Sequence, residues 1–365
     1  MRTSSSSPGR TCLDGTIYPK VSNPRSLDFQ EINARLLRRI RFRGGPSNAI
    51  GLDIGSFSAK GVKVAPAPAG LRVLQTAISL IPPGADKPHS AEAIRQLFQK
   101  LDSREAAVAI AIGGTGTVLR PVSFPKMTPH ELKTALSFEA EKHIPFKLAE
   151  VYLDSAIMRD QAGGRMEVFL AAARKELVEQ RLELLSQAGV TPRIVDLEML
   201  ALANGWELDP MAEKGEAVGL VCVGHCRTLL DFIRGRSLEF AREIPIGGQV
   251  FTQAIAKALQ LDESSAERIK CEPGNRAAEI RTVLQPVWEE WFHQCRASFD
   301  FYESQHGRRV ERLVLSGGSA RLAGFKDWIQ EAAGLPTESW KPPAGLTDGI
   351  DLSVAVGLAA RGVAP

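Results

Sequence analysis

The chain has 365 residues, more than one compact core usually holds, so two domains are expected. Hydrophobic residues make up 44% and charged residues 24%, values that exclude a globally disordered chain. The net charge of +3 divides unevenly, because residues 1–46 carry nine Lys/Arg and three Asp/Glu, a charge of +6, and residues 47–365 carry −3. A nucleic-acid footprint needs positive charge concentrated on the fold itself, so nucleic acid is not an expected partner.

The apolar runs and the cysteines indicate a cytosolic chain. The long uncharged apolar run at 73–81 is far below the roughly 20 residues of a membrane-spanning helix. No apolar stretch follows the first arginines, so residues 1–30 are not expected to be a secretory signal. The five cysteines are scattered without a C-x-x-C pair, which fits reduced thiols. Cys222, His225 and Cys226 lack a second ligand pair, so we expect no metal site there.

The basic N-terminal segment contains a polar stretch and a predicted amphipathic helix. Residues 1–25 are rich in Ser, Pro, Gly and Thr and are expected to be disordered. Asp28 and Glu31 have capping-box spacing, and the helix predicted over 28–43 has an apolar face opposite a face rich in arginine. Two interpretations stay open. The helix binds an anionic membrane surface or a partner's groove, or it packs on the body or remains solvated.

Strands and helices alternate through the first half of the body. The apolar segment AIGLDIG runs into a glycine turn, and alternating strands are predicted over 58–65 and 71–81. Thr128-Pro129, with Glu131 in the first turn, begins a later helix. The other predicted elements are a helix at 89–102, strands at 106–112 and 117–124, a helix at 128–143, strands at 151–158 and 167–173, and helices at 174–188 and 196–206.

A polar break at 209–215 precedes a second set of elements. This set begins with the strand regions EAVGLVCVGHCRTLLDFIRG and SLEFAREIPIGG. The pattern of strand, glycine turn and strand therefore occurs twice, at 49–81 and 217–244, and predicts two similarly built α/β lobes. The remaining predicted elements are helices at 249–260, 263–271 and 275–305, a strand at 310–318, and helices at 322–333 and 351–361.

The first glycine turn has the residues of a phosphate-binding hairpin. In LDIGSFSAK, Asp53 ends a strand and Gly55 lets the backbone turn. The returning strand then carries Ser56, Ser58 and Lys60. Such a turn can aim backbone N–H groups and hydroxyls at phosphate oxygens, while Asp53 can hold a hydrated Mg²⁺. An ordinary hairpin loop uses the same residue types, so this segment alone leaves both interpretations open.

The matching turn of the second half, VCVGHCRT, differs in its chemistry. Gly224 takes the place of Gly55, but Cys222 takes the place of Asp53. A thiol is a poor ligand for a hard cation such as Mg²⁺. A plain hairpin without nucleotide contact is the alternative interpretation here.

Two further glycine pairs precede predicted helices. Gly317-Gly318 ends an apolar strand, where a flat ring or a phosphate can approach the backbone. Gly247-Gly248 precedes another helix, and both pairs are equally compatible with plain turns. Glu267 and Lys270 are three residues apart on one helix, which by itself indicates a solvated ion pair.

The order of these segments resembles the actin-like ATPase superfamily and, within it, the type IV pilus assembly protein PilM family. The segments that carry the resemblance are IGLDIGSFSAKGV, ELKTALSFEAEKHIPF with VYLD, FLAAARKELVEQRLELLSQAGVTPRIVDLEMLALAN, REIPIGG and LVLSGGSARLAGF. Together they cover most of residues 48–360. The IPF after the E-A-E helix and the AARKE stretch distinguish this family from the cell-division protein FtsA and from DnaK-type chaperones.

The resemblance implies an α/β fold with two actin-like lobes, which are duplicated ribonuclease-H-like lobes with small inserted subdomains. The implied organisation is a basic arm at 1–46, a first lobe at 47–200 with an inserted subdomain at about 82–170, a second lobe at 201–350, and a C-terminal helix at 351–365 that returns to the first lobe.

It also implies ATP as the ligand, with Mg²⁺ held through water by Asp53. Glu139 is the weak candidate for an acid that orients the attacking water. The residues implied to bind the nucleotide are Asp53, Gly55, Ser56, Ser58 and Lys60 in the first phosphate loop, Gly224 and Thr228 in the second, Gly247, Gly248, Glu267 and Lys270 on the ribose and base side, and Gly317, Gly318 and Ser319 in the adenosine loop.

PilM-like proteins are cytoplasmic and peripheral at the inner membrane. They bind the short N-terminal cytoplasmic tail of a single-span inner-membrane protein, PilN, and link pilus motor components to the membrane complex. The resemblance places Ile144, Pro145 and Phe146 at the groove for this tail. The helix predicted at 28–43 lies outside the region of resemblance, and is a candidate contact to the membrane surface or to another subunit.

The chain departs from the family in the second phosphate loop, where V-C-V-G replaces the family's V-D-I-G. The lost carboxylate removes a ligand for metal-bound water, and phosphoryl transfer depends on charge stabilisation by metal. We therefore expect an adaptor that binds ATP with weak or absent hydrolysis. The alternatives are an active ATPase or sugar-kinase-like phosphotransferase on the same scaffold, and an FtsA-like membrane-tethered filament protein. Such kinases need an aspartate base, and the sequence offers none in an obvious second site.

Overall fold

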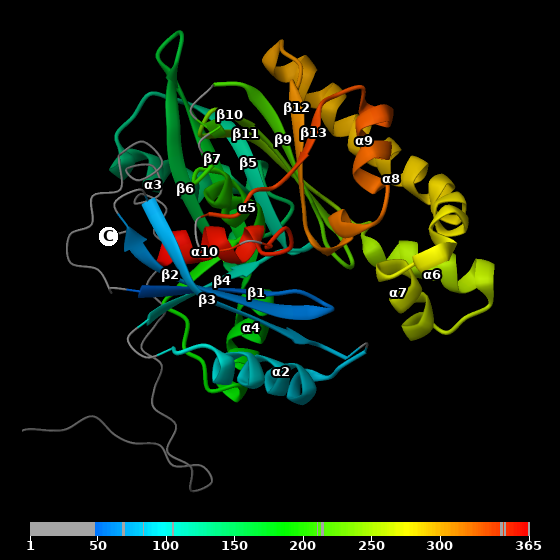
Figure 1. Cartoon of the computed structure of the whole chain (residues 1–365). Helices are drawn as coiled ribbons and strands as arrows, with labels where there is room; N and C mark the ends of the chain where they lie inside the picture. Colours follow the sequence, from blue (N-terminus) through cyan, green and yellow to red (C-terminus); the bar gives the residue numbers. More distant parts are fainter. Residues whose placement is uncertain are drawn as a thin grey trace, which may run out of the picture.

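The structure is a computed structural model that describes residues 48–363 except 68–69, 83, 104–105, 210, 213–214, 344–345 and 347. The expected arm at 1–46 and its helix at 28–43 lie outside the described residues. The described chain contains two five-stranded sheets, one in each lobe, and a separate three-stranded sheet (Figure 1). None of the described helices is long and apolar enough to cross a membrane.

The first lobe has the strand order β3-β2-β1-β4-β8. β1 pairs with β2 antiparallel and with β4 parallel, so the glycine turn at Gly55 connects neighbouring strands. Helices α2 and α4 cover one face of this sheet, and α5 and α10 cover the other (Figure 1). The elements are β1 (Asn48–Ile54), β2 (Ser58–Ala67), β3 (Gly70–Leu80), β4 (Ala106–Ile112), β8 (Ile194–Leu197), α2 (Lys87–Lys100), α4 (Lys175–Gln187), α5 (Glu198–Trp206) and α10 (Ser353–Val363).

The second lobe repeats this order as β11-β10-β9-β12-β13, with β9 and β12 parallel at its centre. The predicted duplication is therefore confirmed. An aromatic cluster that includes Trp288, Trp291 and Phe325 forms the core between this sheet and its helices. The elements are β9 (Ala217–Val223), β10 (Thr228–Arg234), β11 (Ser237–Ile244), β12 (Arg312–Ser316), β13 (Thr337–Ser339), α6 (Gly248–Leu259), α7 (Glu263–Cys271), α8 (Ala277–His306) and α9 (Phe325–Ala333).

The inserted subdomain begins later than the resemblance implied. The expected range of about 82–170 includes α2 and β4, but β4 is apolar throughout and pairs between β1 and β8 in the first sheet. A strand buried on both faces belongs to a covered parallel sheet. The separate sheet, of order β5-β7-β6, starts at Thr117 and consists of β5 (Thr117–Pro125), β6 (Val151–Gln161) and β7 (Arg165–Arg174).

Helix α3 (Pro129–Glu139) covers the three-stranded sheet. Its N-terminus has the predicted signals, because the Thr128 hydroxyl accepts from the Glu131 amide and the Glu131 carboxylate accepts from the Thr128 amide. The helix predicted to reach residue 143 ends at Glu139, and a 3₁₀ turn follows at Ala140–Lys142.

Helix α10 approaches α5 and β1 closely enough to bring backbones into contact. A Cβ on Gly357 would lie 1.7 Å from the Ala201 carbonyl oxygen, and a Cβ on Gly51 would lie 1.9 Å from the Ala355 carbonyl oxygen. Only glycine permits such an approach. Because β1 leads directly into the first glycine turn, this contact fixes where that turn lies.

Replacing Gly357 by Ala should therefore destabilise the fold. The added methyl group meets backbone rather than a movable side chain, and overpacking of this kind costs about 1–3 kcal/mol or more. Chemical denaturation followed by tryptophan fluorescence measures the loss. Ala360→Ser, at a partly exposed position of the same helix, is the control and should stay close to the parent. Equal stability of the Gly357→Ala variant and the parent would contradict the close packing.

Strand β10 carries a buried carboxyl group without a partner. Asp231 is fully buried, and neither of its side-chain oxygens has a hydrogen-bond partner among the described residues. Burial raises the pKa of Asp231 well above its ordinary value. The folded chain therefore holds this group protonated at a pH at which the unfolded chain ionises it.

The pKa of Asp231 is higher in the folded chain than in the unfolded chain. Asp231 therefore lowers the free energy of unfolding more and more as the pH rises above the ordinary carboxyl pKa of about 4. We predict that Asp231→Asn gains stability relative to the parent between pH 4 and pH 7, by up to about 1.4 kcal/mol per pH unit. Denaturant unfolding at several pH values measures this difference. Asp160→Asn, at an exposed site, should show no such trend. A pH-independent difference for Asp231→Asn would show that the carboxyl is ionised in the folded chain.

Candidate functional site

The two glycine turns form the same local structure in the two lobes. The Gly55 amide donates to the Ser58 carbonyl at 3.1 Å, and the Gly224 amide donates to the Arg227 carbonyl at 2.9 Å. In each lobe the residue two positions before the glycine is the last but one of the central strand, Asp53 in the first and Cys222 in the second. Both turns therefore present the same backbone to the space between the lobes, with different chemistry at the strand end.

The tips of the two turns touch across the cleft. The Ser56 hydroxyl donates to the Cys226 sulfur at 3.0 Å, and the rings of Phe57 and His225 lie 5.1 Å apart between centroids. The residues in contact are about 170 positions apart in the sequence and belong to different lobes. The turns therefore close one side of the interlobe cleft.

Behind the tips lies a cavity of about 570 Å³. It brings together seven of the residues that the sequence singled out and several that it did not. The expected residues that line it are Asp53, Gly55, Ser56, Ser58, Lys60, Gly224 and Gly317, and the unexpected charged ones include Lys87, Arg181, Glu198, Arg227 and Asp351.

Asp53, near the end of β1, forms an ion pair at the wall of the cavity. The Lys60 ammonium lies 3.4 Å from the Asp53 carboxylate, across the β1–β2 pair. Although burial alone would lower it, the charge of Asp53 raises the pKa of Lys60. Lys60 is therefore a fixed positive charge in the cavity.

Arg227 and Glu198 form a second ion pair, which sequence reasoning missed. The guanidinium binds both oxygens of Glu198 from Nη2 and Nε, at 2.5 and 3.2 Å, and its Nε lies 3.6 Å from Glu243. Burial raises the pKa of Glu198 above its ordinary value, opposed by the Arg227 charge. A Cβ on Gly113 would lie 2.6 Å from this carboxylate, so glycine leaves room for it. The signal for Glu198 was its position at the start of α5, directly after the short strand β8.

Cys222 is a buried thiol. Its sulfur lies 3.9 Å from the Ser353 hydroxyl, and burial raises the pKa of Cys222 to about 11. The thiol therefore remains protonated at neutral pH and offers no anionic ligand where the resemblance implied a carboxylate.

Thr228 and the Gly247-Gly248 pair are used inside the second lobe. Thr228 is fully buried, donates to the Ile246 carbonyl at 2.8 Å and accepts from Trp291 at 2.9 Å. The amides of Gly248 and Gln249 donate to the carbonyls of the second turn at 2.8 and 2.7 Å. These groups hold that turn in place, and none of Thr228, Gly247 and Gly248 lines the cavity.

Glu267 and Lys270 also lie outside the cavity lining, and they are not the solvated pair that their spacing indicated. Lys270 is buried, and its ammonium donates to Glu267 at 2.6 Å, to Thr252 at 2.8 Å and to the Gly248 carbonyl at 3.1 Å. Ser319 is close to the same group, since its hydroxyl oxygen would lie 2.3 Å from a Cβ on Gly248. These residues connect α6, α7 and the turn after β12.

Gly317 has the backbone that its position requires, with φ of 88° and a Cβ position only 2.5 Å from the Val223 carbonyl. This region is left-handed and favours glycine. At Gly318 a Cβ would meet nothing within 4 Å, so that glycine faces open space.

Glu139 does not reach the cavity. It lies on α3 in the inserted subdomain, and its carboxylate accepts from Lys142 at 2.8 Å.

Ile144 is buried and Phe146 packs beneath Arg174, whose guanidinium lies 5.7 Å above the ring. Pro145 is exposed between them. Ile144 and Phe146 therefore belong to a small core under β6 and β7.

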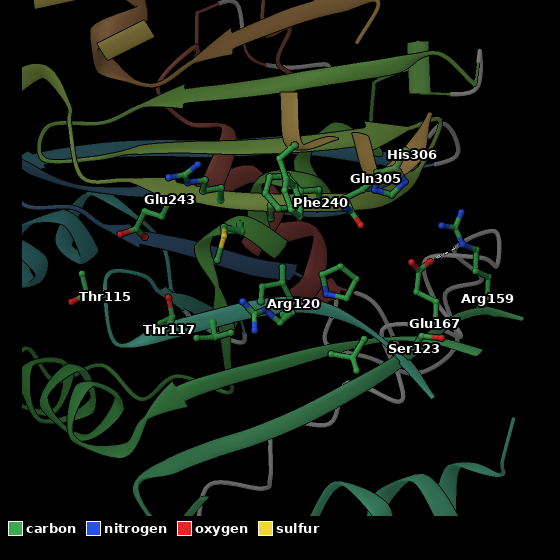
Figure 2. Close-up of a pocket in the computed structure, with 18 of the residues that line it drawn as sticks. Thr115, Thr117, Arg120, Ser123, Arg159, Glu167, Phe240, Glu243, Gln305 and His306 are labelled. Atoms are coloured by element: carbon green, nitrogen blue, oxygen red, sulfur yellow. Dashed lines mark ion pairs between the residues drawn. The ribbon is translucent and has the colours of Figure 1, made fainter. Parts of the chain in front are cut away.

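A second cavity, of about 770 Å³, separates the inserted subdomain from the second lobe. Figure 2 shows β5, with Thr117, Arg120 and Ser123, on one side and β11, with Phe240 and Glu243, on the other. β5 and β11 are each the outer strand of their sheet. Edge strands carry backbone groups that another chain can pair with. The second cavity is therefore a groove between two sheet edges.

Glu243 connects the groove to the cleft. It lines the groove, accepts from the Gly114 amide at 2.8 Å and lies 3.6 Å from Arg227, which lines the cleft cavity. One side chain thus contacts groups of both cavities.

Two lobes with one strand order, matching hairpin turns and a cavity between them define an actin-like fold. The chain belongs to the type IV pilus assembly protein PilM family, which matches residues 51–357.

Three solved structures are similar to this chain to different degrees. The chain is similar to one in a PilM–PilN type IV pilus biogenesis complex, with 30% identity, a TM-score of 0.77 and coverage of 87% of this chain and 99% of that one. The ethanolamine utilization protein EutJ from Carboxydothermus hydrogenoformans has 16% identity and a TM-score of 0.53, with 93% and 99% covered. MreB5 of Spiroplasma citri bound to AMPPNP has 13% identity and a TM-score of 0.51, with 86% and 95% covered. The last two share the fold alone.

We predict that Ser56→Cys will form a disulfide with Cys226 under mild oxidation, because the native hydroxyl lies 3.0 Å from the sulfur. Peptide mapping by mass spectrometry without reductant identifies the link. The matched control, Ser56→Cys with Cys226→Ser, should keep its thiol free. If the single variant also remains reduced, the turns are farther apart in solution than the structure places them.

Proposed function

We propose that the protein is a nucleotide-binding adaptor of a type IV pilus, or a related secretion-type, inner-membrane assembly, and that it binds the cytoplasmic tail of a PilN-like single-span protein. The observation that carries this proposal is membership of the PilM family together with 30% identity to a chain solved in complex with PilN. We propose a location in the cytoplasm, peripheral at the inner membrane. Pilus motor components are further candidate partners.

The cleft cavity supports nucleotide binding. It lies between the two hairpin turns, is large enough for a small ligand, and carries Lys60 and the backbone of the Gly55 turn on one wall. An actin-like relative of the same fold is solved with AMPPNP. ATP is therefore the proposed ligand, and Gly317, whose left-handed backbone also borders the cavity, is proposed to contact it on the opposite side.

Hydrolysis is proposed to be weak or absent. The thiol of Cys222 stands where the family has a carboxylate, and Glu198, an acid in the cavity, is held by the Arg227 guanidinium at 2.5 Å. Both oxygens of this acid accept from the guanidinium, which leaves it poorly placed to take a proton from an attacking water. The protein would then respond to nucleotide binding rather than to turnover.

The groove between β5 and β11 is the proposed site for the PilN-like tail. Phe240 and Phe301 give its wall an apolar part, and their rings lie 5.0 Å apart. Arg120 enters from β5 (Figure 2), and its guanidinium donates to the His143 carbonyl at 3.0 Å with no ion-pair partner among the described residues. Its remaining N–H groups can bind carbonyl or carboxylate oxygens of an extended peptide.

The two sites would communicate through Arg227 and Glu243. A nucleotide that moves the second hairpin turn moves Arg227, and with it the Glu243 side chain that lines the groove. Tail binding and nucleotide binding are therefore proposed to change each other's affinity, which linkage requires to be reciprocal.

We predict that Lys60→Ala will weaken ATP binding about tenfold or more, because it removes a charge-assisted contact to phosphate. Titration of a fluorescent ATP analogue measures this, and a phosphate-release assay should show no steady turnover for either form. Lys126→Ala, at an exposed ion pair of the inserted subdomain, is the control. Steady turnover by the parent chain would overturn the assignment as a non-hydrolysing adaptor.

For the groove, Arg120→Glu should weaken binding of a synthetic PilN-like tail peptide about fivefold or more, as the loss of a central polar contact does. Fluorescence anisotropy of the labelled peptide measures the affinity. Lys133→Glu makes the same charge reversal on α3, outside the groove, and should leave it unchanged. Equal losses for both variants would indicate a general charge effect rather than a contact in the groove.

A further inference from the structure

Each carboxylate that lines the cleft cavity is already bound to a cation of the protein. Asp53 is paired with Lys60 at 3.4 Å and Glu198 with Arg227 at 2.5 Å. The third, Asp351, is paired with Arg321 at 2.9 Å. A metal ion that entered this cavity would therefore compete with a fixed positive charge for every carboxylate ligand.

The remaining strand-end ligand is a thiol. Mg²⁺ takes oxygen ligands in near-octahedral geometry, and a neutral sulfur is among its poorest partners. Cys222 is buried against Ser316 and Ser353, which form a hydrogen bond with each other at 3.0 Å. Within the described part of the chain, no group of three or more His, Cys, Asp or Glu side chains is arranged to hold a metal ion. The cavity does not fit Mg²⁺, although the resemblance implied it.

The cavity does fit an anion, because it holds a guanidinium with unused donors. Arg181 comes from α4 and lines the cavity, and its Nη1 donates to the Ile54 carbonyl at 2.9 Å. No carboxylate among the described residues lies within ion-pair distance of it. Arginine has five N–H donors, so most of those of Arg181 are available. A partly buried guanidinium without an ion-pair partner is stabilised by a bound anion.

We propose that the cleft binds the phosphates of its nucleotide through Arg181 and Lys60 and requires no divalent metal ion. This inference rests on the proposed function and names the chemistry of the same site. The two cations take the charge-neutralising role of Mg²⁺, while Arg227 and Arg321 keep the remaining carboxylates occupied. The ligand is then a free nucleoside triphosphate, which carries more negative charge than its magnesium complex.

Binding of ATP to the full chain, measured by calorimetry in EDTA and in MgCl₂, tests the proposal without any variant. The dissociation constant in EDTA should be within about twofold of, or lower than, the value in MgCl₂. A tenfold or larger loss of affinity in EDTA would overturn the metal-free site while leaving the proposed function intact. No binding under either condition would instead contradict nucleotide binding itself, and the two failures are therefore distinguishable.

The Arg181→Gln variant tests whether Arg181 binds the phosphates. It should weaken ATP binding about tenfold to a hundredfold in EDTA, the range expected for losing a charge-assisted contact. Arg276→Gln removes a guanidinium of the second lobe that is paired with Glu279 outside the cavity, and should bind as the parent does. Thermal melting checks that both variants fold. Unchanged binding by a folded Arg181→Gln variant would contradict the assignment.

Competition with inorganic tripolyphosphate tests whether the ligand is a nucleotide or a polyphosphate without base and ribose. If the cleft contacts the base and the ribose as well as the phosphates, tripolyphosphate should bind more weakly than ATP. Displacing bound ATP should then take a concentration of tripolyphosphate about tenfold or more above the concentration of unlabelled ATP that has the same effect. Equal displacement by the two would show that the site binds polyphosphate alone, which would overturn the assignment of a nucleotide as its ligand.

Discussion

The ion pair between Arg227 and Glu198 is the contact on which the arrangement of the cleft depends. Arg227 belongs to the hairpin turn of the second lobe, and Glu198 begins α5 in the first, so the pair joins the lobes at the wall of the cavity. Partly buried charges attract each other more strongly than exposed ones, and removing one partner leaves the other unsatisfied. The pair therefore fixes the second turn relative to the first lobe, and occupies an acid that could otherwise serve as a base or a metal ligand.

The duplicated architecture explains why one cleft can hold two chemically different turns. Both lobes use the same strand order and the same backbone hydrogen bond at the glycine, so the frame does not depend on the side chain at the strand end. In the first lobe that side chain is Asp53, and in the second it is Cys222. The fold tolerates this exchange because the thiol packs against Ser316 and Ser353, whereas the chemistry at the strand end changes completely.

The sequence predicted much of this fold because its strongest signals are local. Apolar strands that end in D-x-G or C-x-G turns placed the hairpins, and the Thr128 capping signals placed the start of α3. The boundary of the inserted subdomain could not be placed, because β4 differs from an inserted strand only in its neighbours. The resemblance implied Glu139 as a weak candidate for the water-orienting acid, but Glu139 lies outside the cavity, whereas α5 brings Glu198 to its wall. Thr228 matched the family by position, yet its hydroxyl is used inside the second lobe. Side-chain partners across the lobes, such as Arg227 with Glu198, have no signal in a single sequence.

Hydrogen–deuterium exchange of the full chain with and without ATP tests the central claim, that nucleotide lies between the two hairpin turns and influences the groove through Arg227 and Glu243. The account predicts slower amide exchange at both turns, residues 55–58 and 224–228, together with a smaller change along β11 and at the start of β5. Protection confined to one turn, or found only outside the cleft, would contradict it.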